Sequence, residues 1–232
     1  MKFEELHPMA PVFKAGSVHF VNVPGAALIV KEIVEDDCYH LDRIPDGSMI
    51  FDVGGCYGEF GLICAIEKKC KVAMYEPSRM NWQIAGLNYK LNEDQFEAGD
   101  ILMFHAAIGG EENLGREFFY VPNHPAGSGF CMIGGEPELV PTLRLSDQIV
   151  LRKTSSPVVV KFDCEGAERE IFDQDPGWMS MADIITMEWH YTDGEHYRDI
   201  LQSHGFEVSL EGLPHEPWHK ELPRGMIFAQ KS

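Results

Sequence analysis

The sequence predicts an α/β fold in which a mostly parallel, twisted sheet carries helices on both faces. Short apolar runs alternate along the chain with segments of helical periodicity, and this alternation is typical of parallel strands joined by helices. Acidic side chains also recur where several of the apolar runs end. Because such sheets bind ligands outside the carboxyl ends of their strands, this placement indicates a binding site there.

The first predicted elements lead into a glycine-rich turn. Residues 26–34 (AALIVKEIV) fit either a strand or a helix. Residues 48–53 (SMIFDV) form a short apolar run, which predicts a buried strand. A helix is expected over residues 59–69, because its apolar side chains are spaced for one helical face.

A second strand and helix follow, and then a longer apolar run. Residues 72–75 form the strand, and Ser78 is a suitable N-cap for the next helix. Along that helix apolar residues recur at helical spacing, at Met80, Ile84, Leu87 and Leu91. Residues 101–108 (ILMFHAAI) are apolar and stop at two glycines.

The second half continues the alternation. Residues 157–162 (PVVVKF) are the clearest β-branched run, and 183–189 are another strand candidate. Helices are expected at 167–172 and 195–204, and a final pair of strands at 206–210 and 226–230. In residues 121–141, eight of 21 residues are Gly or Pro. We expect either a loop that faces the substrate or a mobile surface loop.

Size and composition indicate one domain. The chain has 232 residues, of which 44% are hydrophobic, and this suffices for one sizeable core. We expect an N-terminal segment, residues 1–46, packed on a single domain over residues 47–232. The oligomeric state cannot be read from the sequence.

The charge balance bears on partners. Acidic residues outnumber basic ones 37 to 19, giving a net charge of −18, which disfavours binding to nucleic acid or to anionic membranes. The six cysteines form no C-x-x-C pair, so a zinc ribbon is not indicated. The amino terminus shows no secretory signal, and no apolar stretch reaches the ~20 residues of a membrane helix. We therefore expect a cytoplasmic protein with free thiols.

The turn FDVGGCYGEFG, residues 51–61, is unusually rich in glycine. Its glycines do not fit the G-x-G-x-x-G pattern of dinucleotide-binding loops. Gly54 and Gly55 allow a ligand to approach the main chain, and Gly58 opens a helix whose free N–H groups favour an anionic group. A strand-to-helix turn without a ligand is the alternative.

Three further acids follow strands at informative positions. Glu76 comes 18 residues after Gly58 and is placed to accept hydrogen bonds from both ribose hydroxyls of a nucleoside. Asp163 and Glu165 flank one residue where a strand ends, so both are expected to face the same cleft. The alternative is a helix start, where acids are favoured by the helix dipole.

These motifs together resemble the FkbM-type family of S-adenosylmethionine-dependent methyltransferases. The resemblance rests on DVGGCYGEFG, YEPS, HAAIGG and above all VKFDCEGAERE, in this order, and covers roughly residues 29–210; the upstream KEIVEDDCY also fits. It implies a class I methyltransferase, Rossmann-like fold with a seven-stranded, mostly parallel sheet and an antiparallel C-terminal strand pair. The cofactor implied is S-adenosylmethionine.

The resemblance also assigns roles by position. The expected cofactor-binding residues are Asp52, Gly54, Gly55, Cys56, Gly58, Glu76, Pro77, Ala106, Ala107 and Asp163. Cys56 replaces an Asn that is frequent in the family, and no role is assigned to its side chain. Arg144 stands where an acid is common.

The activity implied is methyl transfer to an oxygen of a sugar, glycan or secondary metabolite. A hydroxyl needs a general base, and the candidates are Asp163, Glu165 and His190; Asp163 or His190 is expected to take the proton. A divalent metal held by Asp163, Glu188 and His190 is possible but not expected. Aromatic and histidine side chains that either line an acceptor pocket or pack are His124, Phe130, Trp189, Tyr191 and Trp218.

Two other classes of function remain open. The chain could be a catalytically silent module that binds a nucleoside or S-adenosylmethionine. A nicotinamide-dependent oxidoreductase is disfavoured by the glycine spacing.

Overall fold

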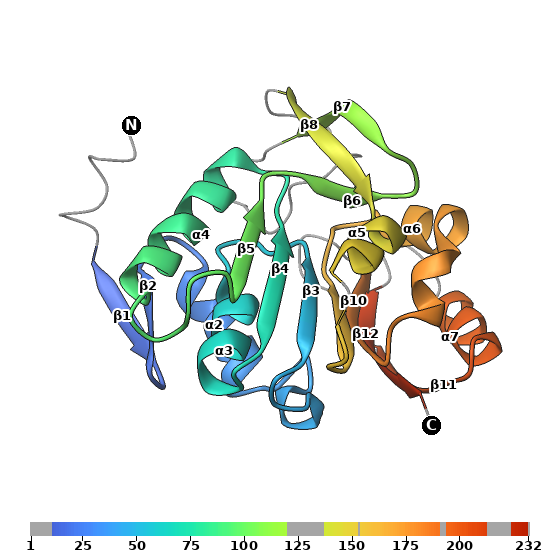
Figure 1. The fold of residues 1–232 in the computed structure, drawn as a ribbon, viewed down its shortest axis with the longest axis horizontal. Helices are drawn as coiled ribbons and strands as arrows, with labels where there is room; N and C mark the ends of the chain where they lie inside the picture. The colour runs from blue at the N-terminus through green and yellow to red at the C-terminus, as the bar shows by residue number, and fades with distance from the viewer. Residues whose placement is uncertain (1–10, 120–136, 153, 191–193, 213–223, 232) are drawn as a thin grey trace.

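The main sheet has seven strands, as expected (Figure 1). The computed structural model describes residues 11–119, 137–152, 154–190, 194–212 and 224–231. The strand order across the sheet is β11 (Phe206–Gly212), β12 (Arg224–Lys231), β10 (Ile184–His190), β9 (Val158–Phe162), β3 (Met49–Val53), β4 (Lys71–Tyr75) and β5 (Ile101–Phe104). The five strands from β10 to β5 are parallel, and β12 runs antiparallel to both of its neighbours. The predicted α/β class and the antiparallel C-terminal pair are confirmed.

Alternate residues of the central strands supply two separate cores. In β3, Ile50 faces one hydrophobic cluster and Phe51 the other; Val159 and Val160 divide in the same way in β9. Successive side chains of a strand point to opposite faces, so a strand that is apolar throughout requires helices on both sides.

The helices of the first half of the chain cover one face of the sheet, and those of the second half cover the other. The first face carries α2 (Ala26–Val34), α3 (Glu59–Glu67) and α4 (Arg79–Leu91), whose buried side chains share a cluster with Ile50. The other face carries α5 (Leu145–Leu151), α6 (Glu168–Gln174), α7 (Gly194–Ser203) and the 3₁₀ turn Pro176–Ser180. Residues 26–34 are therefore a helix, which settles the ambiguity in the sequence. Ser78 caps α4, as predicted: its hydroxyl accepts a hydrogen bond from Asn81 N–H.

The apolar run 101–108 is not one element. Its first part is β5 of the main sheet, and its last residues begin β6 (Ala107–Gly109) of a second, three-stranded sheet with the order β6–β8–β7. The other strands of this small sheet are β7 (Asn113–Phe119) and β8 (Pro137–Arg144). In Figure 1 it lies above the carboxyl ends of β4 and β5.

The small sheet corrects part of the predicted loop at 121–141. Residues 137–141 belong to β8, which pairs antiparallel with β7. Residues 120–136 lie outside the described part of the chain.

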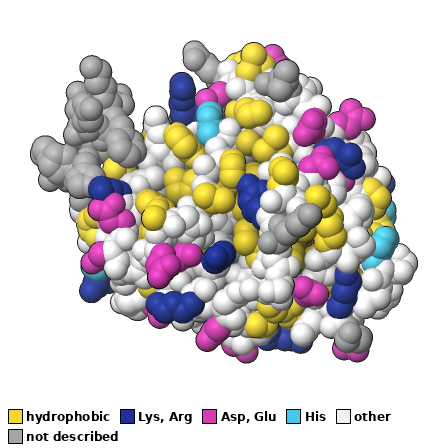
Figure 2. Space-filling view, in the orientation of Figure 1, with side chains coloured by type: hydrophobic (Ala, Val, Ile, Leu, Met, Phe, Trp, Pro, Cys, Tyr) yellow, Lys and Arg dark blue, Asp and Glu magenta, His cyan; other side chains and the backbone are white. Residues whose placement is uncertain are grey.

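In the space-filling view, hydrophobic side chains gather toward the middle and upper part of this face (Figure 2). Leu139 of β8 and Met80 of α4 are among the exposed apolar residues of the protein.

A hairpin that the sequence did not predict packs on α4. It consists of β1 (Val12–Ala15) and β2 (Val18–Val21). Asn88 accepts from Val21 N–H at 2.7 Å and donates to Tyr57 O at 2.8 Å. Asn92 accepts from His19 N–H and donates to His19 O. The two amides of α4 therefore take the place of a neighbouring strand.

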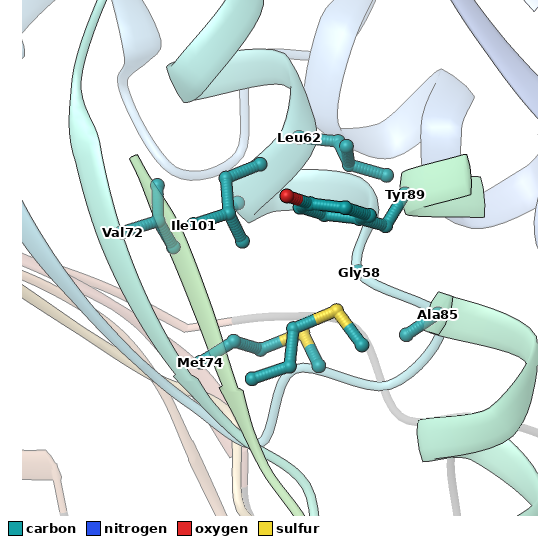
Figure 3. Close-up of a pocket in the computed structure, with 9 residues that line it drawn as sticks. Gly58, Leu62, Val72, Met74, Ala85, Tyr89 and Ile101 are labelled. Atoms are coloured by element: carbon teal, nitrogen blue, oxygen red, sulfur yellow. The ribbon is translucent and has the colours of Figure 1, made fainter. Parts of the chain in front are cut away.

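A small apolar cavity of about 10 Å³ lies beneath the glycine turn (Figure 3). It is enclosed by α3, α4, β4 and β5, and its lining includes Gly58, Met74, Ala85 and Tyr89. A space of this size barely holds one water molecule and offers it no ring of polar partners, so it is a packing void.

No helix in the described ranges is both long and apolar enough to cross a membrane.

Candidate functional site

The glycine turn is shaped by close contacts that exclude side chains. Gly54 has φ +79°, and a Cβ there would lie 1.8 Å from the backbone oxygen of Asp163. A Cβ on Gly55 would lie 2.2 Å from Met74 Cγ. Both N–H groups donate to Tyr75 O. The turn is thus fixed between the ends of β4 and β9, and its bare backbone is what a ligand would meet.

Gly58 ends the turn and begins α3. Its φ of +82° is a left-handed conformation, and no side chain caps the helix at this position. Its N–H donates to Gly55 O, and its carbonyl accepts from Leu62 N–H. The first turn of α3 is therefore placed at the edge where the glycine turn ends, as predicted for an anion-binding helix start.

Cys56 also has left-handed backbone geometry, with φ +47°. Its backbone N–H donates to Glu76 Oε2 at 2.8 Å. Non-glycine residues adopt this conformation uncommonly, and Asn is among those that adopt it best. This explains why Asn suits the position, and it assigns the Cys56 backbone, rather than its thiol, to the site.

Glu76 is buried at the end of β4 and joins two loops. Its second oxygen, Oε1, accepts from Ser78 N–H at 2.7 Å. Burial raises the pKa of Glu76 to about 8, opposed by these backbone hydrogen bonds. Each carboxylate oxygen can accept two hydrogen bonds. Asn81 Nδ2 also donates to Oε1, at 3.5 Å, so the acceptor capacity for a ribose hydroxyl remains on Oε2 while Glu76 holds the glycine turn.

Lys161 is a site residue for which the sequence analysis predicted no role. Its Nζ donates to Gly54 O at 2.7 Å and lies 3.3 Å from Asp52 Oδ1 and 3.8 Å from Asp163 Oδ2. Burial opposes the charge, but the carboxylates outweigh it and raise the pKa of Lys161. Lys161 lies in β9, two residues before Asp163. Because residues i and i+2 of a strand point to the same side, this spacing could have indicated that Lys161 faces the site.

The predicted catalytic residues meet at the ends of β9 and β10. Oxygen and nitrogen atoms of Asp163, Glu165 and His190 lie within 4.8 Å of one another. His190 Nδ1 lies 3.2 Å from Glu168 Oε1, and Nε2 lies 3.9 Å from Glu165 Oε2. Burial lowers the pKa of His190, but hydrogen bonds to Glu168 and Glu188 outweigh it and raise that pKa well above its usual value.

Glu165 and Glu188 differ in their surroundings. Glu165 has φ +53°, and burial raises its pKa to about 8, with His190 opposing. Glu188 Oε1 lies 3.6 Å from His190 Nε2 and 3.3 Å from Arg224 Nη1. The residues that could share a metal ion are therefore grouped around Glu165 rather than the predicted Glu188. A second such group in the described ranges is Asp37, His40 and Asp42.

Tyr39 enters the site from a segment for which the sequence predicted no function. Its hydroxyl donates to Asp163 Oδ2 at 2.9 Å. Tyr39 ends the KEIVEDDCY segment that fits the family resemblance, but that segment did not indicate this contact, which joins positions 124 residues apart.

The residues expected near adenine also come together. His105 lies between β5 and β6, and its Nε2 lies 3.0 Å from Pro77 O. Ala106 and Ala107 follow it and are buried. This places the end of β5 beside the residue that follows Glu76.

Two other residues named in the sequence analysis have structural contacts. Trp189 is buried in the core that faces α7, and Arg144 precedes α5 and pairs with Asp175 at 2.8 Å. The remaining candidates for an acceptor pocket, His124, Phe130, Tyr191 and Trp218, lie outside the described residues.

Comparison with protein families decides the assignment. The profile of the Methyltransferase FkbM domain matches residues 52–208, which is more than half of the chain. The chain belongs to the FkbM methyltransferase family. The match runs from Asp52 at the glycine turn to β11 and includes the whole Asp163 cluster. No curated protein matches the chain in sequence.

Solved structures share the fold. A methyltransferase FkbM from Methylobacillus flagellatus KT superposes with a TM-score of 0.53 at 18% identity, over 82% of this chain and 45% of that protein. This chain thus spans under half of that relative. A precorrin-6y C5,15-methyltransferase from Geobacter metallireducens GS-15 gives 0.52 at 13% identity, over 92% and 94%. A tRNA m1G37 methyltransferase of M. jannaschii gives 0.51 at 8% identity, over 96% and 57%. At these identities the likeness shows the fold.

The FkbM methyltransferase family implies S-adenosylmethionine as the cofactor, and the residues present fit it. A Cβ at Gly54 would clash with the Asp163 backbone, so the turn keeps a bare main chain after β3. Asp52 is fully buried beside Lys161, and Glu76 stands at the next strand end. These are the groups expected to meet an amino-acid tail and a ribose.

Proposed function

We propose that the chain methylates a hydroxyl oxygen of a sugar, glycan or secondary metabolite. The observation that carries the proposal is the Asp163–Glu165–His190 cluster beside the glycine turn. When bound, S-adenosylmethionine supplies an activated methyl group. An acceptor hydroxyl must lose its proton as the new bond forms, and a carboxylate of this cluster is suited to take it.

Asp163 is the favoured proton acceptor in this proposal. His190 has a raised pKa, so it carries a proton near neutral pH and cannot accept another. Its charge instead balances the carboxylates of Glu165 and Glu168, to which it lies close. Asp163 is anchored at the end of β9 through its own N–H, which donates to Val53 O at 3.0 Å. The structure thus favours one of the two bases expected from the sequence.

The site residues divide the remaining work. Glu76 is proposed to bind the ribose hydroxyls, Pro77 with Ala106 and Ala107 to lie against adenine, and Asp52 with the glycine turn to hold the amino-acid tail. Positioning is the larger part of catalysis when the transferred group is already activated.

An acceptor screen that follows S-adenosylhomocysteine release tests the proposal. We expect release with hydroxylated small molecules and a loss of about 100-fold or more in kcat for Asp163→Asn, with S-adenosylhomocysteine binding retained. The surface variant Asp173→Asn is the matched control. Full turnover in Asp163→Ala would contradict the proposed base, and a loss confined to His190→Ala would assign the role to His190.

Calorimetry separates this proposal from the two other functions. Binding of S-adenosylmethionine and S-adenosylhomocysteine without turnover on any acceptor would favour a silent module, and binding of NAD would favour an oxidoreductase. The acidic charge of the chain favours a small acceptor over nucleic acid.

A metal ion is not required in this proposal. Three carboxylates around the cluster already lie beside protein cations: Asp163 beside Lys161, Glu168 beside His190 and Glu188 beside Arg224. We expect turnover to survive exhaustive chelation. A loss that Mg²⁺ or Mn²⁺ restores would instead assign a metal to Asp163, Glu165 and His190.

A further inference from the structure

Tyr39 belongs to a segment that precedes the residues matched by the family profile. It lies after α2 and before the 3₁₀ turn Leu41–Arg43, whereas the match begins at residue 52. The side chain is buried, and its ring packs edge-on against Phe60 of α3, with ring centroids 5.4 Å apart. This packing fixes where the hydroxyl points.

The electrostatics of the neighbouring residues place the same segment at the strand ends. Burial raises the pKa of Cys38 to about 12, and Glu188 and Asp163 add to this effect. Burial also raises the pKa of Glu32 in α2, again with contributions from Glu188 and Asp163. Glu32, Cys38 and Tyr39 therefore lie near the carboxylates of Asp163 and Glu188.

The contact with Asp163 is made to one carboxylate oxygen. Tyr39 OH donates to Oδ2 at 2.9 Å, and Lys161 Nζ approaches the same oxygen at 3.8 Å. Lys161 Nζ also lies 5.4 Å from the centre of the Tyr39 ring. Tyr39 thus supplies the hydrogen bond to this oxygen, and Lys161 adds a nearby positive charge, so the orientation of the carboxylate depends on the hydroxyl.

The hydroxyl remains a donor over the working pH range. Burial, followed by the nearby charge of Asp163, raises the pKa of Tyr39 well above its ordinary value. Tyr39 therefore cannot serve as a base, and its polar atom can only orient its neighbour.

We propose that Tyr39 is a positioning residue that aims the Asp163 carboxylate at the acceptor hydroxyl, so that the N-terminal segment completes the catalytic site. The inference rests on the proposed function of Asp163. A base that is misdirected by a fraction of an ångström is expected to lose about 10- to 100-fold in rate. A purely structural Tyr39 would act through its ring alone.

Tyr39→Phe separates the hydroxyl from the ring. We expect kcat to fall about 10- to 100-fold, with S-adenosylhomocysteine affinity and melting temperature near those of the parent protein. Tyr89→Phe is the matched control, because Tyr89 also packs against a phenylalanine, Phe96, but lies on α4 and lines the apolar void. A kcat within twofold of the parent protein would overturn the proposal.

A double-mutant cycle tests whether Tyr39 acts through Asp163. In the Asp163→Asn background, adding Tyr39→Phe is expected to cost nothing further. A second full loss there would show that the hydroxyl acts elsewhere and would overturn the positioning role.

An acceptor-independent measurement keeps this test separate from that of the proposed function. With ¹³C-carboxyl aspartate, the Asp163 resonance, assigned by its absence in Asp163→Asn, should move in Tyr39→Phe and stay in Tyr89→Phe. An unmoved resonance would overturn the proposal even if an acceptor is found. If no acceptor is found, the proposed function fails, while the resonance still decides the contact.

Discussion

Single backbone positions set the shape of the cofactor turn. Gly54 and Gly47 have nearly the same positive φ, +79° and +74°, but only Gly54 faces an obstacle, the Asp163 backbone. A side chain at Gly54 must therefore overcome both an unfavourable conformation and a steric clash, whereas one at Gly47 meets only the first.

We expect Gly54→Ala to lower the free energy of unfolding by about 3 kcal/mol and to abolish S-adenosylhomocysteine binding. Gly47→Ala is expected to cost about 1 kcal/mol and to bind normally. Denaturant titration and calorimetry measure both. Equal losses in the two variants would show that the turn is limited by conformation alone.

Cys56 presents the opposite case, a side chain at a position that favours Asn or Gly. Cys56→Asn is expected to keep or slightly raise stability, because Asn tolerates the left-handed conformation. Cys56→Val, whose side chain branches at Cβ, is expected to lose about 1–2 kcal/mol. Thermal unfolding of both variants checks the order, and a Val variant at least as stable as the Asn variant would refute it.

At the scale of elements, the asparagines of α4 hold the N-terminal hairpin. Asn88→Ala would leave Val21 N–H and Tyr57 O without their amide partner, at a cost of about 1–3 kcal/mol. Hydrogen exchange at the Val21 amide should accelerate with it. Lys90→Ala is the control, since Lys90 pairs with Glu93 on the surface. Unchanged exchange at Val21 would show that the hairpin is held by its apolar contacts.

The sequence predicted the main elements well but not the small sheet or the hairpin. Runs such as 158–162 are buried on both faces of the sheet. A central parallel strand therefore reads as a nearly continuous apolar run, which can be recognised in the sequence without knowing its neighbours. Strand β8 pairs with two strands of other segments, and no local period in residues 101–141 encodes such pairing. The break between β5 and β6 was hidden because both halves of the run are apolar.

The same distinction holds within the site. The strand-end acids and the glycine turn were found from spacing along the chain, and the structure brings Asp163, Glu165 and His190 together as expected. Tyr39 reaches the site through its hydrogen bond to Asp163, which is distant in sequence, and Glu168 reaches it as a partner of His190. Such contacts depend on the folded geometry, which one sequence does not display.

For the whole molecule, buried acids make stability depend on pH. Burial raises the pKa of Glu59, Glu76 and Glu165 to about 8 in the folded protein, above their values in an unfolded chain. The folded state therefore binds more protons than the unfolded state between about pH 4.5 and 8. Its free energy of unfolding should fall as pH rises through this window, and the raised pKa of His190 acts in the same direction.

Glu59→Gln isolates one of these groups without changing its size. In the variant, the free energy of unfolding should fall less steeply between pH 5 and 8, with a slope that differs by at most about 1.4 kcal/mol per pH unit. Denaturant titrations at pH 5, 6.5 and 8 measure it, with the exposed Glu97→Gln as control. An unchanged slope would show that Glu59 is ionised in the folded protein.

The small sheet has a consequence for how such proteins diversify. All three of its strands come from one continuous stretch, which leaves the main sheet after β5 and returns at α5. It packs on the rest of the protein through Ile108, which is buried in the main core, and through polar links such as Arg116 to Glu170 and Arg144 to Asp175. A stretch of this kind can be exchanged as a cassette, so a new acceptor preference could be grafted onto an unchanged cofactor cradle.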